Sequence, residues 1–136
     1  MTTVRQLAAQ DLDTHWNTIG PLLNHALTRS KCNDYGIVDV YNASKSGAWT
    51  VYIAEEKNKI TGVATVIFQQ YPNDIVAYIT AVSGRLVGDK ATSDKLFDLL
   101  RARGAARVQG AARPSIVRLW RRIGLEEKYA IVEGQL

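Results

Sequence analysis

The sequence predicts a mixed α/β domain with a mainly antiparallel central sheet and helices on both faces. Three segments rich in β-branched and aromatic residues follow one another between residues 49 and 82, and short turns separate them, as in sequential antiparallel strands. Two helical segments precede these strands, and two helix–strand units follow them. The expected order is therefore β-α-α-β-β-β-α-β-α-β, and the 136 residues suit a single domain spanning residues 1–136.

The first part of the chain is expected to form a short strand and two helices. Alternating polarity indicates the strand, and apolar residues that recur every three to four positions indicate the helices. Gly20-Pro21 lies inside the first helix and is expected to kink or split it, because proline has no backbone N–H to donate. Asn33 or Asp34 is expected to cap the second helix. These elements are a strand over residues 3–7, a helix over residues 12–28 and a helix over residues 35–44.

The remainder is expected to complete the sheet and to add two more helices. Residues 75–82 are apolar on both faces of a strand, which predicts a central position. Gly104 and Gly124 are expected to end the two helices, and Pro114 suits the first position of the second one. In order, the elements are strands at 49–54, 60–70 and 75–82, a helix at 92–103, a strand at 107–111, a helix from 114 to 124 and a closing strand at 129–133.

Composition excludes several classes of protein. Cys32 is the only cysteine, and with His15 and His25 it forms no familiar metal-ligand spacing, so neither a disulfide nor a metal centre is expected. No apolar run reaches the about 20 residues that span a bilayer, and the first residues lack an export signal. We therefore expect a protein of the reducing cytoplasm with no membrane partner.

The positive charge is concentrated near the C-terminus. Residues 85–128 carry 11 basic and 5 acidic side chains, within a chain whose net charge is +4. A basic region indicates an anionic partner, such as a phosphorylated cofactor, nucleic acid or an acidic protein face, or else a solvated helix surface. Nucleic acid is not expected, because the basic residues of the last helix do not share one face and few aromatic residues lie near them. Those residues are Arg113, Arg118, Arg121 and Arg122.

The loop Arg85-Leu86-Val87-Gly88-Asp89-Lys90 is the most informative stretch. It connects the expected central strand to a helix, and the N-terminus of a helix presents free backbone N–H groups and a partial positive charge. Arg85 and Lys90 add full charges beside that N-terminus. The loop therefore predicts a phosphate site, with a plain basic turn as the alternative.

This element order and this loop resemble the GNAT superfamily of acetyl-CoA-dependent acetyltransferases. The family loop reads Gln/Arg-x-x-Gly-x-Gly/Ala, and Arg85 and Gly88 match its first and fourth positions. Lys90 occupies the sixth position, where the family has a small residue. The resemblance implies acetyl-CoA as cofactor. It also implies that the backbone of Ala81 and Val82 meets the pantetheine arm and that the pyrophosphate is surrounded by Arg85, Val87, Gly88, Asp89 and Lys90.

Two further segments carry the resemblance. The end of the last helix, residues 119–125, is similar to the family's Phe-Tyr-x-x-x-Gly-Phe, with Leu125 in place of the final Phe. Ser46-Gly47 followed by the strand at Trp49 resembles small GNAT-like proteins encoded by tailed bacteriophages.

The expected catalytic positions depart from the family. Many members use a Tyr four residues before the glycine of the last helix as the acid, and that position is Trp120, whose indole donates a hydrogen bond but does not ionise. We expect Trp120 to be a core anchor. The usual base is a Glu on the central strands, and residues 75–82 hold no carboxylate. Tyr78, with a phenol of ordinary pKa about 10, and Ser115 are the catalytic candidates.

Two functions follow from these observations. The first is a degenerate GNAT-fold protein that serves as a structural or assembly component of a phage particle, beside other proteins, with little or no transferase activity. The alternative is an active N-acetyltransferase acting on a small-molecule or protein amine, with water relaying the proton. The missing acid and base favour the first.

Overall fold

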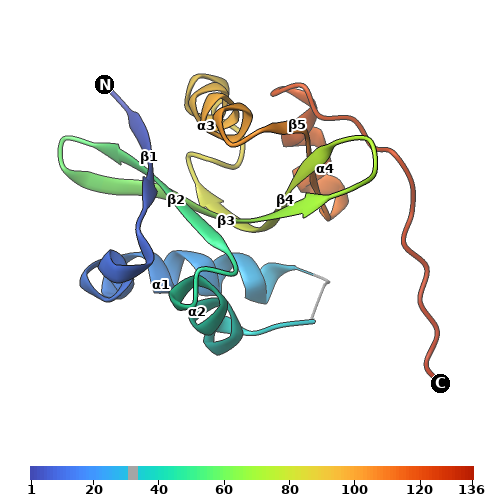
Figure 1. The fold of residues 1–136 in the computed structure, drawn as a ribbon, viewed down its shortest axis with the longest axis horizontal. Coiled ribbons are helices and arrows are strands. Elements are labelled where there is room, and N and C mark those ends of the chain that lie inside the picture. Colours follow the sequence, from blue (N-terminus) through green and yellow to red (C-terminus); the bar gives the residue numbers. More distant parts are fainter. Residues whose placement is uncertain (31–33) are drawn as a thin grey trace.

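The computed structural model describes residues 1–30 and 34–136, and it confirms the mixed α/β fold class. Five strands form one sheet in the order β1-β2-β3-β4-β5 (Figure 1). The first four strands pair antiparallel, and β5 pairs parallel to β4. The strands are β1 (Thr3–Leu7), β2 (Thr50–Glu56), β3 (Lys59–Gln70), β4 (Ile75–Gly84) and β5 (Ala105–Gly110).

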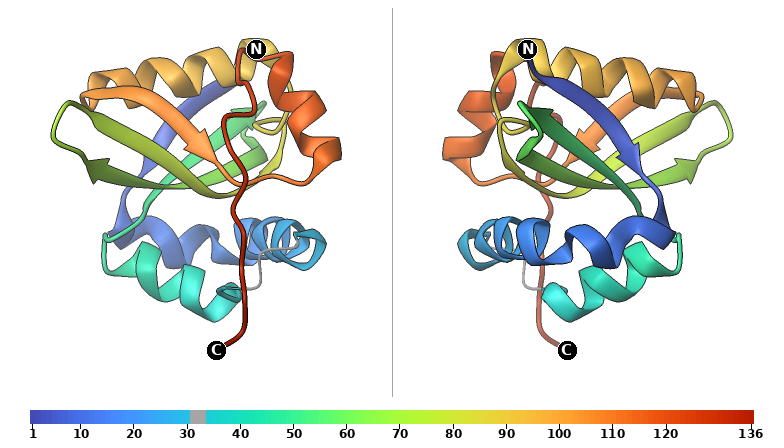
Figure 2. Two further views of the ribbon diagram at one scale, coloured as in Figure 1. Left: turned by 90° about the vertical axis from the view of Figure 1, so that its right-hand side faces the viewer. Right: turned by 90° about the vertical axis from the view of Figure 1, so that its left-hand side faces the viewer.

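Helices cover both faces of the sheet. The first two lie together on one face and α3 lies on the other, as Figures 1 and 2 show. The last helix, α4, follows β5 and lies beside its end (Figure 2). The helical elements are the short 3₁₀ turn η1 (Ala9–Asp11), α1 (Leu12–Arg29), α2 (Ile37–Lys45), α3 (Lys90–Ala102) and α4 (Pro114–Arg121).

Each face of the sheet has its own apolar core. Each aliphatic side chain that is fully buried there stabilises the fold by about 1.5–3 kcal/mol. The core under α1 and α2 contains Leu7, Leu12, Ile19, Leu23, Val40, Val51, Ile53, Val63 and Ala81. The core under α3 contains Tyr52, Ala54, Ala64, Val66, Ala77, Ile79, Leu86, Leu96 and Leu100.

The start of the chain differs from expectation in two places. Helix α1 runs unbroken through Pro21, so the predicted split is wrong. Ile19 and Leu23 on either side of the proline are fully buried, and this packing holds the helix together. Asp34 does not cap α2, because the N-cap of the helix is Gly36, whose N–H donates to the Asp39 carboxylate at 2.8 Å. The alternative cap, Asn33, lies outside the described residues.

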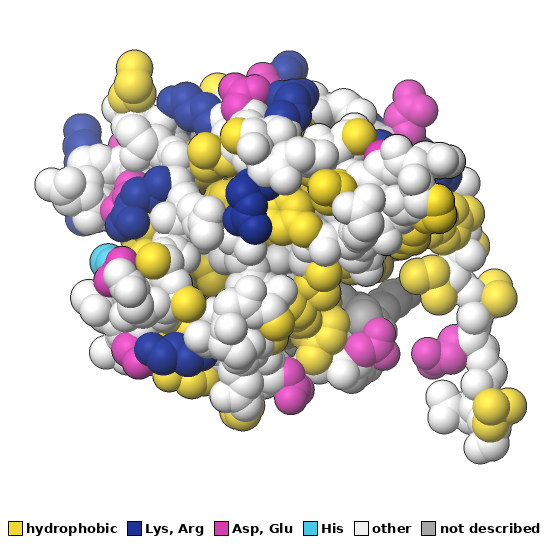
Figure 3. Space-filling view, viewed as in Figure 1, with side chains coloured by type: hydrophobic (Ala, Val, Ile, Leu, Met, Phe, Trp, Pro, Cys, Tyr) yellow, Lys and Arg dark blue, Asp and Glu magenta, His cyan; other side chains and the backbone are white. Residues whose placement is uncertain are grey.

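The closing strand expected at 129–133 does not form. Residues 125–136 contain no helix or strand, and they extend away from the body of the molecule (Figures 1 and 3). Tyr129, Ile131 and Val132 are 69%, 76% and 90% exposed. Alternating polarity makes a segment suitable for a sheet, but a strand also needs a neighbour that accepts its hydrogen bonds. Gly104 and Gly124 do follow their helices with left-handed backbones, at φ 94° and 96°.

Candidate functional site

The central feature is a cleft where β4 and β5 part. Their parallel pairing begins at Ile75 with Ala105 and ends at Ile79 with Gly110. Beyond that point β5 has ended, whereas β4 continues to Gly84, and a cavity of about 290 Å³ opens beside it. The described residues that line it are His25, Ala26, Leu27, Arg29, Ser30, Tyr35, Ile79, Thr80, Ala81, Val82, Ser83, Gly84, Val87, Ala111, Ala112, Arg113, Ile116 and Trp120.

A β-bulge lies at the inner end of this cleft. Val66 pairs with Ile79 and Thr65 pairs with Ala81, so Thr80 is the extra residue on β4. The Thr80 hydroxyl donates to the Thr65 carbonyl at 3.0 Å and lies 2.7 Å from the Thr65 hydroxyl. The bulge therefore places two hydroxyl groups side by side where the two strands separate.

Tyr35 reaches this bulge from the segment that precedes α2. Its hydroxyl donates to the Thr80 carbonyl at 2.5 Å, and its ring meets Trp49 edge to face with centroids 5.1 Å apart. Tyr35 is half-buried and is the only phenol among the described residues that line the cleft. Sequence reasoning missed it, because an aromatic residue in a connection carries no signal of the strand that it will meet.

Trp120 forms a wall of the cleft. Its side chain is buried, as expected of a core anchor, and its ring lies over Gly110 at the end of β5. A Cβ placed on Gly110 would stand 2.7 Å from Trp120 Cη2. The absence of a side chain at Gly110 thus lets the indole close the cleft against β5.

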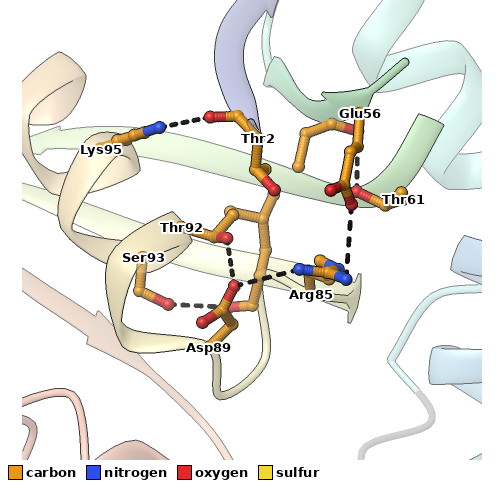
Figure 4. A network of polar contacts seen from close by, with 10 residues as sticks. Thr2, Glu56, Thr61, Arg85, Asp89, Thr92, Ser93 and Lys95 are labelled. Carbon is orange, nitrogen blue, oxygen red and sulfur yellow. Dashed lines mark hydrogen bonds and ion pairs between the residues drawn. The ribbon is translucent and has the colours of Figure 1, made fainter. Parts of the chain in front are cut away.

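The loop before α3 is held by its own ion pairs (Figure 4). The Arg85 guanidinium lies 3.4 Å from the Glu56 carboxylate and 3.8 Å from the Asp89 carboxylate, which also accepts from the Thr92 hydroxyl at 2.5 Å. Lys90 pairs with Asp94 at 2.8 Å. Both basic side chains of the loop are therefore partly neutralised within the chain.

The start of α3 still carries the features of an anion site. The N–H groups of its first turn have no acceptor within the helix, because the first intrahelical bond runs from Ser93 to Asp89 at 2.9 Å. The helix dipole adds a partial positive charge there. Asp89 provides no side-chain cap to these N–H groups.

The structure separates the sequence-predicted site residues into two groups. Ala81, Val82 and Val87 line the cleft. Arg85, Gly88, Asp89 and Lys90 belong to the loop that leaves it, and Gly88 faces α4, where a Cβ would lie 3.4 Å from Leu119.

The two catalytic candidates lie elsewhere. Tyr78 pairs with Gln109 in the part of β4 that is still bonded to β5, and it lines a separate, larger groove beside the C-terminal segment. Ser115 is exposed at the start of α4 and lines neither hollow. The cleft therefore offers Tyr35 and Thr80 in their place.

The described part of the chain contains neither a metal-ligand cluster nor a helix suited to crossing a membrane. Within residues 1–30 and 34–136, no group of three or more His, Cys, Asp or Glu side chains is placed to hold a metal ion. No helix in those ranges has the length and apolar character that crossing a bilayer requires.

Solved structures share this fold. An aminoglycoside acetyltransferase from an uncultured soil sample, in complex with sisomicin, superposes with a TM-score of 0.70 at 18% identity, covering 99% of this chain and 96% of that one. An aminoglycoside N-acetyltransferase in complex with CoA gives 0.70 at 15% identity, with 100% and 95% covered. Glucosamine-6-phosphate N-acetyltransferase from Arabidopsis thaliana gives 0.65 at 17% identity, with 99% and 98% covered.

The likeness is one of fold and not of sequence. No protein-family model and no curated protein matches the sequence. The chain thus has the fold of GNAT acetyltransferases over nearly its whole length, and its activity has to be argued from its own residues.

Proposed function

We propose that this protein binds acetyl-CoA in the cleft between β4 and β5 and transfers the acetyl group to an amine. The observation that carries the proposal is the unpaired edge of β4. Residues 80–84 have no strand beside them on the β5 side, and a cavity of about 290 Å³ adjoins that edge. The CoA complex of a structure with this fold supports acetyl-CoA as the cofactor.

The residues present fit such a cofactor. Ala81 and Val82 offer backbone groups to an amide-bearing arm, as a strand offers them to a neighbouring strand. The first turn of α3 offers N–H groups to phosphate oxygens. Arg85 and Lys90 would exchange their carboxylate partners for phosphate. Acetyl-CoA would supply the acetyl group as a reactive thioester.

Hydroxyl groups and water carry out the proton transfers of this reaction. No Asp or Glu is among the described residues that line the cleft, so deprotonation of the amine passes through water or through the Thr65–Thr80 hydroxyl pair. The Tyr35 hydroxyl, whose oxygen lies 2.5 Å from the Thr80 carbonyl oxygen, donates its proton to that carbonyl at the bulge. From there the phenol can protonate the leaving sulfur, the role that Trp120 is unable to fill.

The second candidate is a non-catalytic protein with a structural role, such as a component of a phage particle. Two observations favour it. Trp120 occupies the acid position, and the loop cations are paired with Glu56, Asp89 and Asp94 rather than free. In this case the cleft would be a remnant of an enzyme fold.

Turnover distinguishes the two candidates. The purified protein is incubated with acetyl-CoA and a panel of small and peptide amines, and released CoA is measured. Amine-dependent release supports the transferase and excludes the structural role. No acetyl-CoA binding, together with detection of the chain in purified phage particles, would exclude the transferase.

A further inference from the structure

The cleft is lined by cations without matching anions. Arg29 and Arg113 line it, together with the imidazole of His25. No carboxylate is among the described lining residues, and Asp34 lines the larger groove, which Arg113 also lines. Because arginine stays protonated at any physiological pH, both of these lining residues carry a permanent positive charge.

The two arginines are brought together by the fold. Arg29 is the last residue of α1, and Arg113 is the residue that precedes α4. The Arg113 Nη1 donates to the Arg29 carbonyl at 3.2 Å, which fixes the start of α4 against the end of α1. The Arg113 guanidinium therefore reaches the C-terminal end of α1, at the cleft that both residues line.

These charges differ from those of the phosphate loop in two respects. Arg85 and Lys90 have carboxylate partners, whereas neither Arg29 nor Arg113 is ion-paired within the described residues. The loop leads into α3 on one face of the sheet, whereas Arg29 ends α1, which lies on the opposite face (Figures 1 and 2). A ligand whose phosphates occupy the start of α3 leaves Arg29 and Arg113 free for another molecule.

We infer that the acceptor amine carries an anionic group, a phosphate or a carboxylate, that binds Arg29 and Arg113. This inference rests on the proposed acetyl transfer, because it assigns the acceptor of that reaction. Guanidinium groups bind phosphate and carboxylate through paired charge-assisted hydrogen bonds. The same charges repel a polycationic amine, which no described carboxylate in the cleft would compensate. The acceptor therefore differs in charge from an aminoglycoside such as sisomicin.

Matched amines test the assignment by binding alone. O-phosphoethanolamine is compared with ethanolamine, and β-alanine with β-alaninamide, in NMR titrations of the ¹⁵N-labelled protein. These pairs keep the amine and change only the anionic group, so they also separate phosphate from carboxylate. We expect at least one of the two anionic amines to bind about tenfold more tightly than the matched amine that lacks the anionic group, the effect of a charge-assisted contact of about 1.4 kcal/mol.

Two variants locate the contact. Arg113→Gln and Arg29→Gln are expected to remove most of that preference, because each deletes one guanidinium of the pair. Arg118→Gln is the matched control, since Arg118 is exposed on α4 and lines neither hollow. It is expected to leave the preference unchanged.

Other outcomes overturn the inference. The inference is wrong if the two members of each matched pair bind with equal affinity, or if neither anionic amine binds. It is also wrong if spermidine binds more tightly than the anionic amines. Competition by CoA against the anionic amines would also overturn it, because the arginines would then serve the cofactor. A separate titration with acetyl-CoA tests the proposed function. A failure of the proposed function is thereby distinguished from a failure of the acceptor assignment.

Discussion

Replacing Gly110 with alanine tests whether Trp120 is held where the structure places it. The added Cβ would stand 2.7 Å from Trp120 Cη2 and 2.9 Å from Cζ3. Since non-bonded carbon atoms are best separated by about 3.5–4.0 Å, the ring would have to move by roughly 1 Å. Trp120 is only 7% exposed, so the displaced ring would move into the cleft or press on its buried neighbours.

The expected cost follows from overpacking. Crowding of this kind destabilises a fold by about 1–3 kcal/mol. Alanine in place of glycine also restricts the unfolded chain, which offsets about 0.4–1 kcal/mol of that cost. We therefore expect Gly110→Ala to lower the free energy of unfolding by about 1–2 kcal/mol, measured by urea denaturation followed by circular dichroism.

A double-mutant cycle isolates the contact. In a Trp120→Leu background the added methyl meets no indole, so Gly110→Ala should cost close to nothing there. Gly88→Ala is the control, because its Cβ would lie at an ordinary 3.4 Å from Leu119. An equal cost of Gly110→Ala in both backgrounds would refute the claim that Trp120 packs on Gly110.

Two more substitutions probe the cleft and the sheet. Tyr35→Phe removes the hydroxyl that donates to the Thr80 carbonyl, so we expect kcat to fall by about a hundredfold. The affinity for acetyl-CoA, measured by calorimetry, should be retained. An unchanged kcat would exclude Tyr35 as the acid. Asp74 forms a two-bond ion pair with Arg107 at 2.7 and 2.9 Å, which lowers the pKa of the Asp74 carboxyl below 3.8. A lowered folded-state pKa stabilises the fold above the unfolded value and loses that effect as the pH falls through the folded value. Asp74→Asn should therefore reduce Tm at neutral pH. The difference should shrink as the pH falls below 3.8 and vanish once the pH is below the lowered folded-state pKa, whereas Asp98→Asn on exposed α3 should show little effect at any of these pH values. A difference that persists in strong acid would contradict the ion-pair explanation.

Much of the fold was predictable because its signals are local. The strands at 50–56, 59–70 and 75–84 follow from β-branched runs separated by turns, and their predicted limits differ from the observed ones by at most two residues. Pro114 does begin α4. Helix α3 begins at Lys90, two residues earlier than expected, because Asp89 and not a later residue is its N-cap.

The incorrect predictions concern segments whose conformation is determined by tertiary contacts. Buried neighbours on both sides keep α1 helical through Pro21, and no local rule contains that information. The segment at 129–133 alternates like a strand, but it extends away from the body and has no strand to pair with.

Only those parts of the candidate site that are contiguous in the sequence could be predicted. The loop at 85–90 and the backbone of Ala81 and Val82 could be placed because they precede a helix in a recognisable pattern. Tyr35, Arg29 and Arg113 could not, since they reach the cleft from three segments that are distant in sequence. The pairing of Arg85 with Glu56 likewise depends on how β2 lies beside the loop.

Calorimetric titration with acetyl-CoA tests the central claim most directly, with the wild type compared with Gly88→Glu. A Cβ at this position would meet Leu119 at an ordinary 3.4 Å, so we expect the fold to persist, which circular dichroism checks, and the added charge would repel phosphate at the start of α3. We predict one binding site in the wild type and a loss of at least about tenfold in affinity in the variant. Gly134→Glu, where a Cβ would have no neighbour within 4 Å, should bind like the wild type. A wild type that does not bind acetyl-CoA, or a Gly88→Glu variant that binds it equally well, would contradict the assignment of the cleft and its loop.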